Sequence, residues 1–278
     1  PLSSIISQNY QHLLARMPEH IIYRNSSDDG VIEISQNQHT RSLYFGNDAK
    51  QSCMDIFQPS RLVLSYTRAM MASLLFQPQP QKILIIGLGG GSIAKFLLQH
   101  YPDCSIDIVE IRADVVKIAH GYFNLPEDER MQIFIDDASR FLRNQNGRYQ
   151  QYDLILIDAF NHDGVSESIK TFEFFEHCAE RLNETGVAAT NLWNNKNDHS
   201  HEFNQTMEHI FNHNVLNLPV PDRGNVIIFT TKNKHTLQLS NVNNFATNLE
   251  NNLGLEFSEF SRQIKRANRW RSLGRLFV

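Results

Sequence analysis

The candidate functional residues are three acidic side chains and one glycine-rich turn, each at the end of a short apolar run. The turn runs from Gly87 to Ser92, and the acids are Glu110, Asp137 and Asp158. Glycines let a ligand approach the backbone closely, and here they lead into a predicted helix N-terminus. This pattern favours a nucleotide-type ligand, although a tight strand-to-helix turn uses the same residues.

The three acids have different possible roles. Glu110 can hold both hydroxyls of a ribose, or it can be a solvated acid at a strand end. Asp137, which precedes Ala138, can cap the next helix or accept a hydrogen bond from an adenine amino group. A site for NAD needs the glycines and the first acid only. Acids after three successive strands therefore favour a sulfonium nucleoside such as S-adenosylmethionine over NAD.

The elements that must position these residues alternate between strand and helix after residue 82. Predicted strands cover 82–88, 105–111, 131–137, 152–160, 186–193 and 225–232, and predicted helices cover 92–99, 113–122, 138–143, 168–182 and 201–211. Short apolar strands that alternate with helices predict a mostly parallel, doubly wound, Rossmann-like sheet covered on both faces. In such a sheet, ligands bind beyond the carboxyl ends of the strands, where the strand order reverses.

The two ends of the chain differ from this α/β region. Residues 21–55 contain short β-prone runs separated by Asp-Gly and Gly-Asn turns, which predict successive hairpins, and 60–76 has helical spacing. Phe257, Phe260 and Ile264 recur at helical spacing in a basic tail, which predicts a docked amphipathic helix. We expect an N-terminal β-hairpin domain over 1–60, an α/β domain over 61–235 and a C-terminal helical and basic tail over 236–278.

Composition bounds the partners. The chain has 278 residues, 41% of them hydrophobic, which is enough for a sizeable core. A net charge of −4 gives no electrostatic reason to expect nucleic acid or an anionic membrane as partner. We find no apolar run of about 20 residues, the length that spans a bilayer, and no signal-peptide pattern. Three scattered cysteines predict neither a disulfide framework nor a structural metal site, so we expect a cytoplasmic location.

From about Tyr23 to Lys232 the chain resembles the polyamine aminopropyltransferase, or spermidine synthase-like, family. The resemblance implies a small N-terminal β-domain and an α/β domain of the S-adenosylmethionine-methyltransferase type, and it implies a homodimer. The matching residues are Gln51 at the end of a β segment, Tyr66 of a helical Tyr motif, the loop glycines Gly87, Gly89 and Gly91, Glu110, Asp137 with Ala138, and Asp158.

What the resemblance implies for function is an aminopropyl transfer from decarboxylated S-adenosylmethionine to a small-molecule amine. Asp158 and Tyr66 would be catalytic, with Asp158 as general base. Glu110 would hold the ribose, Asp137 and Ala138 would contact the adenine, and Gln51 and the loop glycines would complete the donor site. A base is needed because an amine must be neutral to attack the carbon beside a sulfonium, whereas most alkylamines are protonated at pH 7.

Departures from the family pattern keep alternatives open. Gly90 stands where the family has an aspartate that anchors the donor's ammonium, and Asn161 replaces a second aspartate after the fourth strand. We expect Asn161 and His162 to contact the acceptor, and His162 is an alternative base. Gly90 raises the alternative of intact S-adenosylmethionine as donor, and therefore of a methyltransferase. A nucleoside-binding homologue without turnover is the third alternative.

Overall fold

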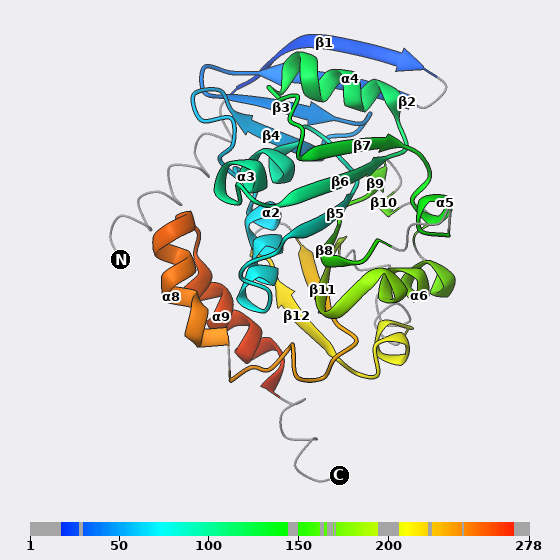
Figure 1. Ribbon diagram of the computed structural model, residues 1–278. Helices are drawn as coiled ribbons and strands as arrows, with labels where there is room; N and C mark the ends of the chain where they lie inside the picture. Colours follow the sequence, from blue (N-terminus) through cyan, green and yellow to red (C-terminus); the bar gives the residue numbers. More distant parts are fainter. Residues whose placement is uncertain are drawn as a thin grey trace.

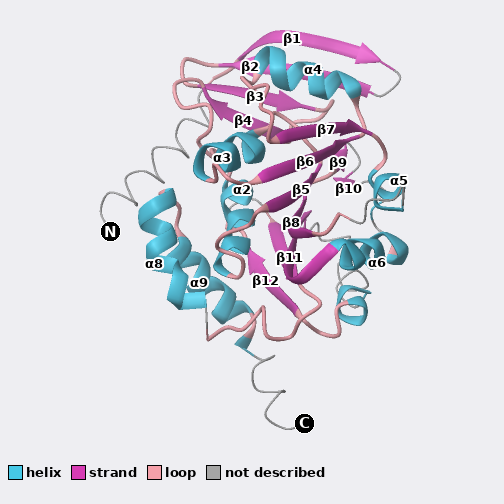
Figure 2. Cartoon of the chain, in the orientation of Figure 1, coloured by secondary structure: helices cyan, strands magenta, loops and turns pink. Residues whose placement is uncertain are grey.

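The structure is a computed structural model in which a small antiparallel sheet lies beside a larger sheet flanked by helices (Figures 1 and 2). It describes residues 18–27, 30–143, 150–161, 164–165, 169, 171–193, 206–221, 224–240 and 242–269. Within these ranges, no helix is long and apolar enough to cross a bilayer.

The N-terminal sheet is a four-stranded antiparallel meander in the order β1-β2-β3-β4. Its strands are β1 (His20–Ser27), β2 (Gly30–Gln36), β3 (Thr40–Tyr44) and β4 (Lys50–Asp55). The hairpins predicted over 21–55 are therefore confirmed. β1 forms one edge of the sheet at the top of Figure 1, and it is exposed along most of its length.

The segment that connects the two sheets begins its helix later than predicted. Helix α2 (Ser65–Met70) continues into the 3-10 helix η1 (Met71–Leu75), but the residues just before Ser65 are extended. Leu62 forms an antiparallel bridge with Met54 of β4, and both side chains are buried. Tertiary pairing with the N-terminal sheet therefore overrides the helical spacing of this short stretch.

The central sheet has seven strands in the order β12-β13-β11-β8-β5-β6-β7. They are β5 (Lys82–Ile86), β6 (Ser105–Glu110), β7 (Met131–Ile135), β8 (Tyr152–Ile157), β11 (Leu182–Trp193), β12 (Val215–Pro219) and β13 (Asn225–Thr230). Strands β7, β6, β5, β8 and β11 run parallel, and β13 is antiparallel to β11. The order reverses between β5 and β8, so the doubly wound sheet is confirmed and its ligand-binding end is located.

Helices cover both faces of this sheet. Two of them, α5 (Ala138–Arg143) and α6 (Phe172–Arg181), lie on one face, and α3 (Ser92–His100), α4 (Ala113–Tyr122), α8 (Val242–Leu253) and α9 (Phe257–Ala267) lie on the other (Figure 1). Ile83 and Ile85 of β5 belong to one hydrophobic cluster, and Leu84 and Ile86 to the second. The continuous apolar run of this strand is therefore explained by burial on both sides.

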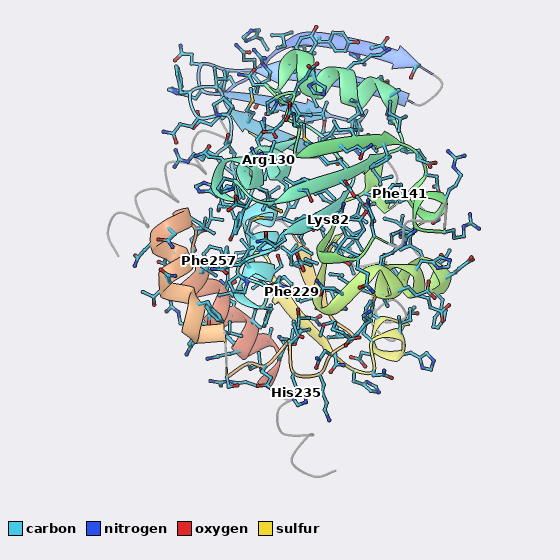
Figure 3. All side chains as sticks on the ribbon, viewed as in Figure 1. Lys82, Arg130, Phe141, Phe229, His235 and Phe257 are labelled. Carbon is cyan, nitrogen blue, oxygen red and sulfur yellow. The ribbon has the colours of Figure 1, made fainter. Side chains whose placement is uncertain are left out.

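Arg130 closes the end of α3. It precedes β7, and its guanidinium donates to the carbonyl oxygens of Leu98, Tyr101 and Pro102 at 3.1, 3.2 and 3.1 Å (Figure 3). These carbonyls follow the last turns of the helix, where backbone acceptors lack partners within the helix. The interaction joins the helix that follows the glycine loop to the strand at the sheet edge.

The C-terminal segment forms a helical hairpin that packs against η1 and β12, and an ion pair joins it to α2. Gly254, with a φ of 68°, separates α8 from α9, so the C-terminal tail predicted to be helical contains two helices. Phe257, Phe260 and Ile264 are buried, as expected for a docked amphipathic helix. Arg68 of α2 donates through Nε to Glu256 Oε1 at 3.0 Å, and it also donates to the carbonyl oxygen of Val63 at 2.8 Å. This partly buried ion pair connects α2 to the start of α9.

Candidate active site

A cavity of about 500 Å³ lies between the N-terminal sheet and the carboxyl ends of β5, β6 and β8. Its described walls come from four places: the N-terminal sheet with Val31, Phe45, Gln51 and Ser52, helix α2 with Tyr66 and Thr67, the start of α3 with Ser92, Ile93 and Ala94, and the sheet end with Gly87, Leu88, Gly89, Glu110, Ile111, Arg112 and Asp158. The cavity therefore lies at the switch point of the central sheet and is covered by the small sheet.

The glycine loop is packed against the end of β8. The amide of Gly87 donates to the carbonyl oxygen of Val109 at 2.8 Å. The amide of Asp158 donates to the carbonyl oxygen of Ile86, also at 2.8 Å. Gly87 has a φ of 92°, and a Cβ atom there would overlap the backbone of Asp158. Only glycine allows this approach, which places the loop beside the carboxylate. Gly91 then begins α3 in a left-handed conformation.

Glu110 holds the loop in place from the end of β6. Its carboxylate accepts hydrogen bonds from the amides of Leu88 and Arg112, both at 2.9 Å, one on each oxygen. Burial raises the pKa of Glu110, and these hydrogen bonds oppose the rise because they favour the charged form. Each carboxylate oxygen keeps a further lone pair for a ligand hydroxyl.

Asp158 is the acid whose pKa is suited to proton transfer near neutral pH. It follows β8, and burial raises its pKa to about 6, while hydrogen bonds from Asn191 and Tyr66 act in the opposite direction. The Asn191 amide nitrogen donates to Asp158 Oδ1 at 2.9 Å. With this pKa the carboxylate is mostly ionised at pH 7 and can accept a proton.

Tyr66 connects two of the other predicted residues. Its hydroxyl donates to the backbone oxygen of Gln51 at 2.9 Å, and it also hydrogen-bonds the Asp158 side chain. A phenol has a single hydrogen, so it donates to one of these acceptors at a time. The structure thus brings together Gln51 of β4, Tyr66 of α2 and Asp158, which follows β8.

The predicted adenine contacts lie outside the described lining of the cavity. The Asp137 carboxylate accepts a hydrogen bond from the amide of Arg140 at 3.0 Å, which is the helix-capping role, and Ala138 is buried at the start of α5. Of the predicted acceptor contacts, His162 and the side chain of Asn161 fall outside the described residues. Asn161 contributes its backbone to the short hairpin β9 (Phe160–Asn161) and β10 (Gly164–Val165).

Gly90 is enclosed on the side where a side chain would project. A Cβ atom there would lie 2.7 Å from Ser52 Oγ and 2.8 Å from the Phe123 ring. Phe123 is itself buried, and buried Lys95 of α3 donates to its backbone oxygen. Desolvation lowers the pKa of Lys95 to about 7. An acid at position 90 would need Phe123 to move.

Ser52 and Asn191 were not predicted from the sequence. Ser52 lines the cavity, and its hydroxyl lies 3.2 Å from that of Ser92 at the start of α3. Asn191 is buried and contacts Asp158. The one available signal for Asn191 is a polar pair, Thr190-Asn191, inside the otherwise apolar run 186–193. Across the described residues, no group of three or more histidines, cysteines or acids is arranged to hold a metal ion.

Comparison with known proteins gives consistent matches. The family model for the spermine/spermidine synthase domain matches residues 63–244. A polyamine aminopropyltransferase of Chromobacterium violaceum is 35% identical over 249 residues, which cover 89% of this chain and 94% of that protein.

Two solved structures share the fold. One is human methyltransferase-like protein 13 in complex with SAH, with a TM-score of 0.63 and 22% identity, covering 68% of this chain and 92% of that one. The second is a spermidine synthase in complex with the transition state analogue AdoDATO, with a TM-score of 0.61 and 21% identity, covering 81% of this chain and 79% of that one.

Proposed function

Because the chain belongs to the spermine/spermidine synthase family, we propose that it transfers an aminopropyl group from decarboxylated S-adenosylmethionine to a small-molecule amine. The observation that carries this proposal is Asp158. Its carboxylate lies at the cavity, beside the glycine loop, and has a pKa of about 6. A base with that pKa is ionised where an amine acceptor must lose its proton.

The donor would lie along the sheet end. Glu110 has lone pairs available for the ribose hydroxyls, and the glycine loop, with Gly87 and Gly89, allows the nucleoside to approach the backbone. The exposed side chain of Ile111, also at the cavity, offers an apolar surface for the base of the nucleoside. This placement directs the sulfonium end of the donor toward Asp158.

The reaction is a direct displacement. The neutral amine nitrogen forms a bond to the aminopropyl carbon beside the sulfonium, and the carbon–sulfur bond breaks with its electron pair going to sulfur. The products are the alkylated amine and 5′-methylthioadenosine, and the proton released from nitrogen goes to Asp158. The sulfonium is already an activated leaving group, so the protein supplies proximity, alignment and the base.

Tyr66 would assist through its single hydrogen. It can donate to Asp158 while that carboxylate is ionised, and it can donate to the Gln51 oxygen once Asp158 carries the proton. This exchange would keep the hydroxyl satisfied in both protonation states of the base.

Gly90 favours a second candidate, methyl transfer from intact S-adenosylmethionine. The enclosed position 90 leaves no room for an acid that would pair with the ammonium of the decarboxylated donor. A site without that acid repels the methionyl carboxylate less.

A paired assay tests the two candidates. Purified protein is incubated with either donor and a panel of diamines and polyamines, and both products are followed by mass spectrometry. Aminopropyl transfer predicts 5′-methylthioadenosine and an acceptor heavier by one aminopropyl group, with the decarboxylated donor only. S-adenosylhomocysteine and a methylated acceptor would overturn it in favour of the methyltransferase. Nucleoside binding by calorimetry without either product would favour the non-catalytic alternative.

We also propose a homodimer that pairs through the N-terminal sheet. β1 is an edge strand, and Ile21 is 54% exposed on it. An exposed edge strand with apolar side chains readily pairs with a second copy. Light scattering on the purified protein should give twice the chain mass, and Ile21→Lys should lower it. The cytoplasmic location stays a prediction from the sequence.

A further inference from the structure

Two buried asparagines lie behind Asp158 and form a chain of hydrogen bonds. Asn225 Nδ2 donates to Asn191 Oδ1 at 2.9 Å, and Asn191 Nδ2 donates to Asp158 Oδ1 at 2.9 Å. Asn191 is 4% exposed and Asn225 is 8% exposed. Neither is found among the described residues that line the cavity, so they reach the chemistry through Asp158 only.

The sheet register creates this arrangement. In the parallel pair of β11 and β8, Thr190 is opposite Ile157, so the next residues, Asn191 and Asp158, are neighbours. In the antiparallel pair of β11 and β13, Trp193 is opposite Asn225, which makes Asn225 the diagonal neighbour of Asn191 on the same face. Three adjacent strands thus contribute one group each.

The Asp158 carboxylate determines which group donates in each of these hydrogen bonds. An ionised carboxylate only accepts hydrogen bonds, so Asn191 must turn its NH₂ group toward Asp158 and its oxygen toward Asn225. Asn225 must then donate to that oxygen. Hydrogen bonds in such a chain polarise one another in a low-dielectric interior, which strengthens the last one.

We infer that Asn191 and Asn225 are positioning residues for Asp158. Their two hydrogen bonds, called the relay below, orient the Asp158 carboxylate through Oδ1 and stabilise its ionised form. The proton is therefore accepted at Oδ2. The inference rests on the proposed role of Asp158 as base. The hydrogen bond from Asn191 counteracts burial, which raises the pKa of Asp158. Across the described part of the cavity, the other charged or titratable groups are Tyr66 from α2 and Glu110 and Arg112 from the end of β6.

The test compares four variants by the acid limb of the pH–kcat profile. Asn191→Leu removes the donor and should raise the apparent pKa by about one to two units, as expected for a lost hydrogen bond to a charged group. At pH 7 kcat should then fall roughly two- to tenfold, and it should recover at pH 9. Asn191→Asp should raise the pKa further because of like charge, and Asn225→Leu by about half a unit.

Thr190→Val is the matched control. Thr190 precedes Asn191 and is also buried, and among the described residues its hydroxyl has no hydrogen-bond partner. Removing that hydroxyl therefore disturbs the strand without touching the relay. Its profile should equal that of the unmodified protein. If the two asparagines only stabilise the fold, the variants should lower the free energy of unfolding, and their apparent pKa values should not rise in the order Asn225→Leu, Asn191→Leu, Asn191→Asp. If Asn191→Leu does not fold, Asn225→Leu carries the test.

A second readout does not depend on activity. The carboxyl carbon of Asp158 is titrated by NMR in protein labelled with ¹³C-aspartate, and its resonance is assigned by its loss in Asp158→Asn. This readout also separates Asp158 from His162, because a histidine ordinarily titrates in the same range. If the Asp158 pKa rises in the asparagine variants while no aminopropyl product forms, the relay stands and the proposed function fails. If transfer occurs and the Asp158 pKa does not move, the relay is wrong and the function stands.

Discussion

Gly87 and Asp158 approach each other so closely that a Cβ atom on Gly87 would sit 2.9 Å from the carbonyl carbon of Asp158. This contact joins the glycine loop after β5 to the end of β8 at the switch point of the sheet. The donor site and the proposed base are therefore fixed relative to one another by main-chain packing rather than by side chains.

Gly87→Ala should test this packing. The alanine would clash with backbone and would have a φ of 92°, so we expect a loss of unfolding free energy of about 2 kcal/mol or more and a strong loss of kcat. Urea unfolding measures the first and the transfer assay the second. Gly121→Ala is the control, because nothing lies within 4 Å of its Cβ position on α4, and it should raise stability by up to about 1 kcal/mol. Equal behaviour of the two variants would contradict the packing argument.

Asp158→Asn should separate chemistry from binding. Asparagine keeps an oxygen for the hydrogen bond from Asn191 but cannot accept the proton, so kcat should fall by a factor on the order of 10² or more. The dissociation constant of the donor, measured by calorimetry, should change less than about threefold, since its proposed contacts are elsewhere. Undiminished turnover would remove Asp158 as the base, and His162→Gln would then test the alternative.

Glu110→Gln should weaken the donor site. The new NH₂ group would face a backbone amide of Leu88 or Arg112, and one acceptor for the ribose would be lost. Charged hydrogen bonds of this kind are worth about 1.5–3 kcal/mol, so the donor Kd should rise roughly 10- to 100-fold. Glu127→Gln makes the same change of charge at an exposed position and should leave Kd unaltered. An unchanged Kd in Glu110→Gln would place the ribose elsewhere.

Lys95→Met should change how stability depends on pH. The folded-state pKa of Lys95 is lowered to about 7, against 10.5 for a free lysine, so between these values the unfolded chain binds more protons than the folded one. Stability should therefore rise with pH across this window, by at most about 1.4 kcal/mol per pH unit from this group. Lys95→Met should remove that slope when unfolding is measured from pH 7 to 10, and Lys117→Met, at an exposed position of α4, should retain it. A slope that persists in Lys95→Met would show that Lys95 stays protonated.

The α/β part of the fold was predictable because its signals are local. Helices α4 and α5 begin and end at the predicted residues, since apolar periodicity and flanking strands define both ends. Strand β12 was missed because its run, "VLNLP", is short, mixes polar with apolar residues and ends in proline at a sheet edge. The delayed start of α2 depends on the pairing of Leu62 with β4, which no local pattern reveals.

The site residues that stand at the ends of predicted strands could be predicted from the sequence. The residues that contact them from other strands could not. Glu110 and Asp158 follow apolar runs, so their placement at one sheet edge follows from the fold. Asn191 lies 33 residues after Asp158, and it meets the carboxylate only through the register between β8 and β11. The position of Ser52 likewise depends on how the small sheet covers the large one, which is a tertiary property.

The ion pair between Arg68 and Glu256 has a consequence for synthesis of the chain. The two residues are 188 positions apart, so α2, which carries Arg68 and Tyr66, is synthesised well before the hairpin that carries Glu256. At about 5 to 20 residues per second, some 10 to 40 seconds separate the two partners. Throughout this interval the nascent chain has Tyr66 but lacks Glu256, the ion-pair partner of Arg68 on the same helix, so α2 gains this contact with α9 only after residue 256 has been synthesised.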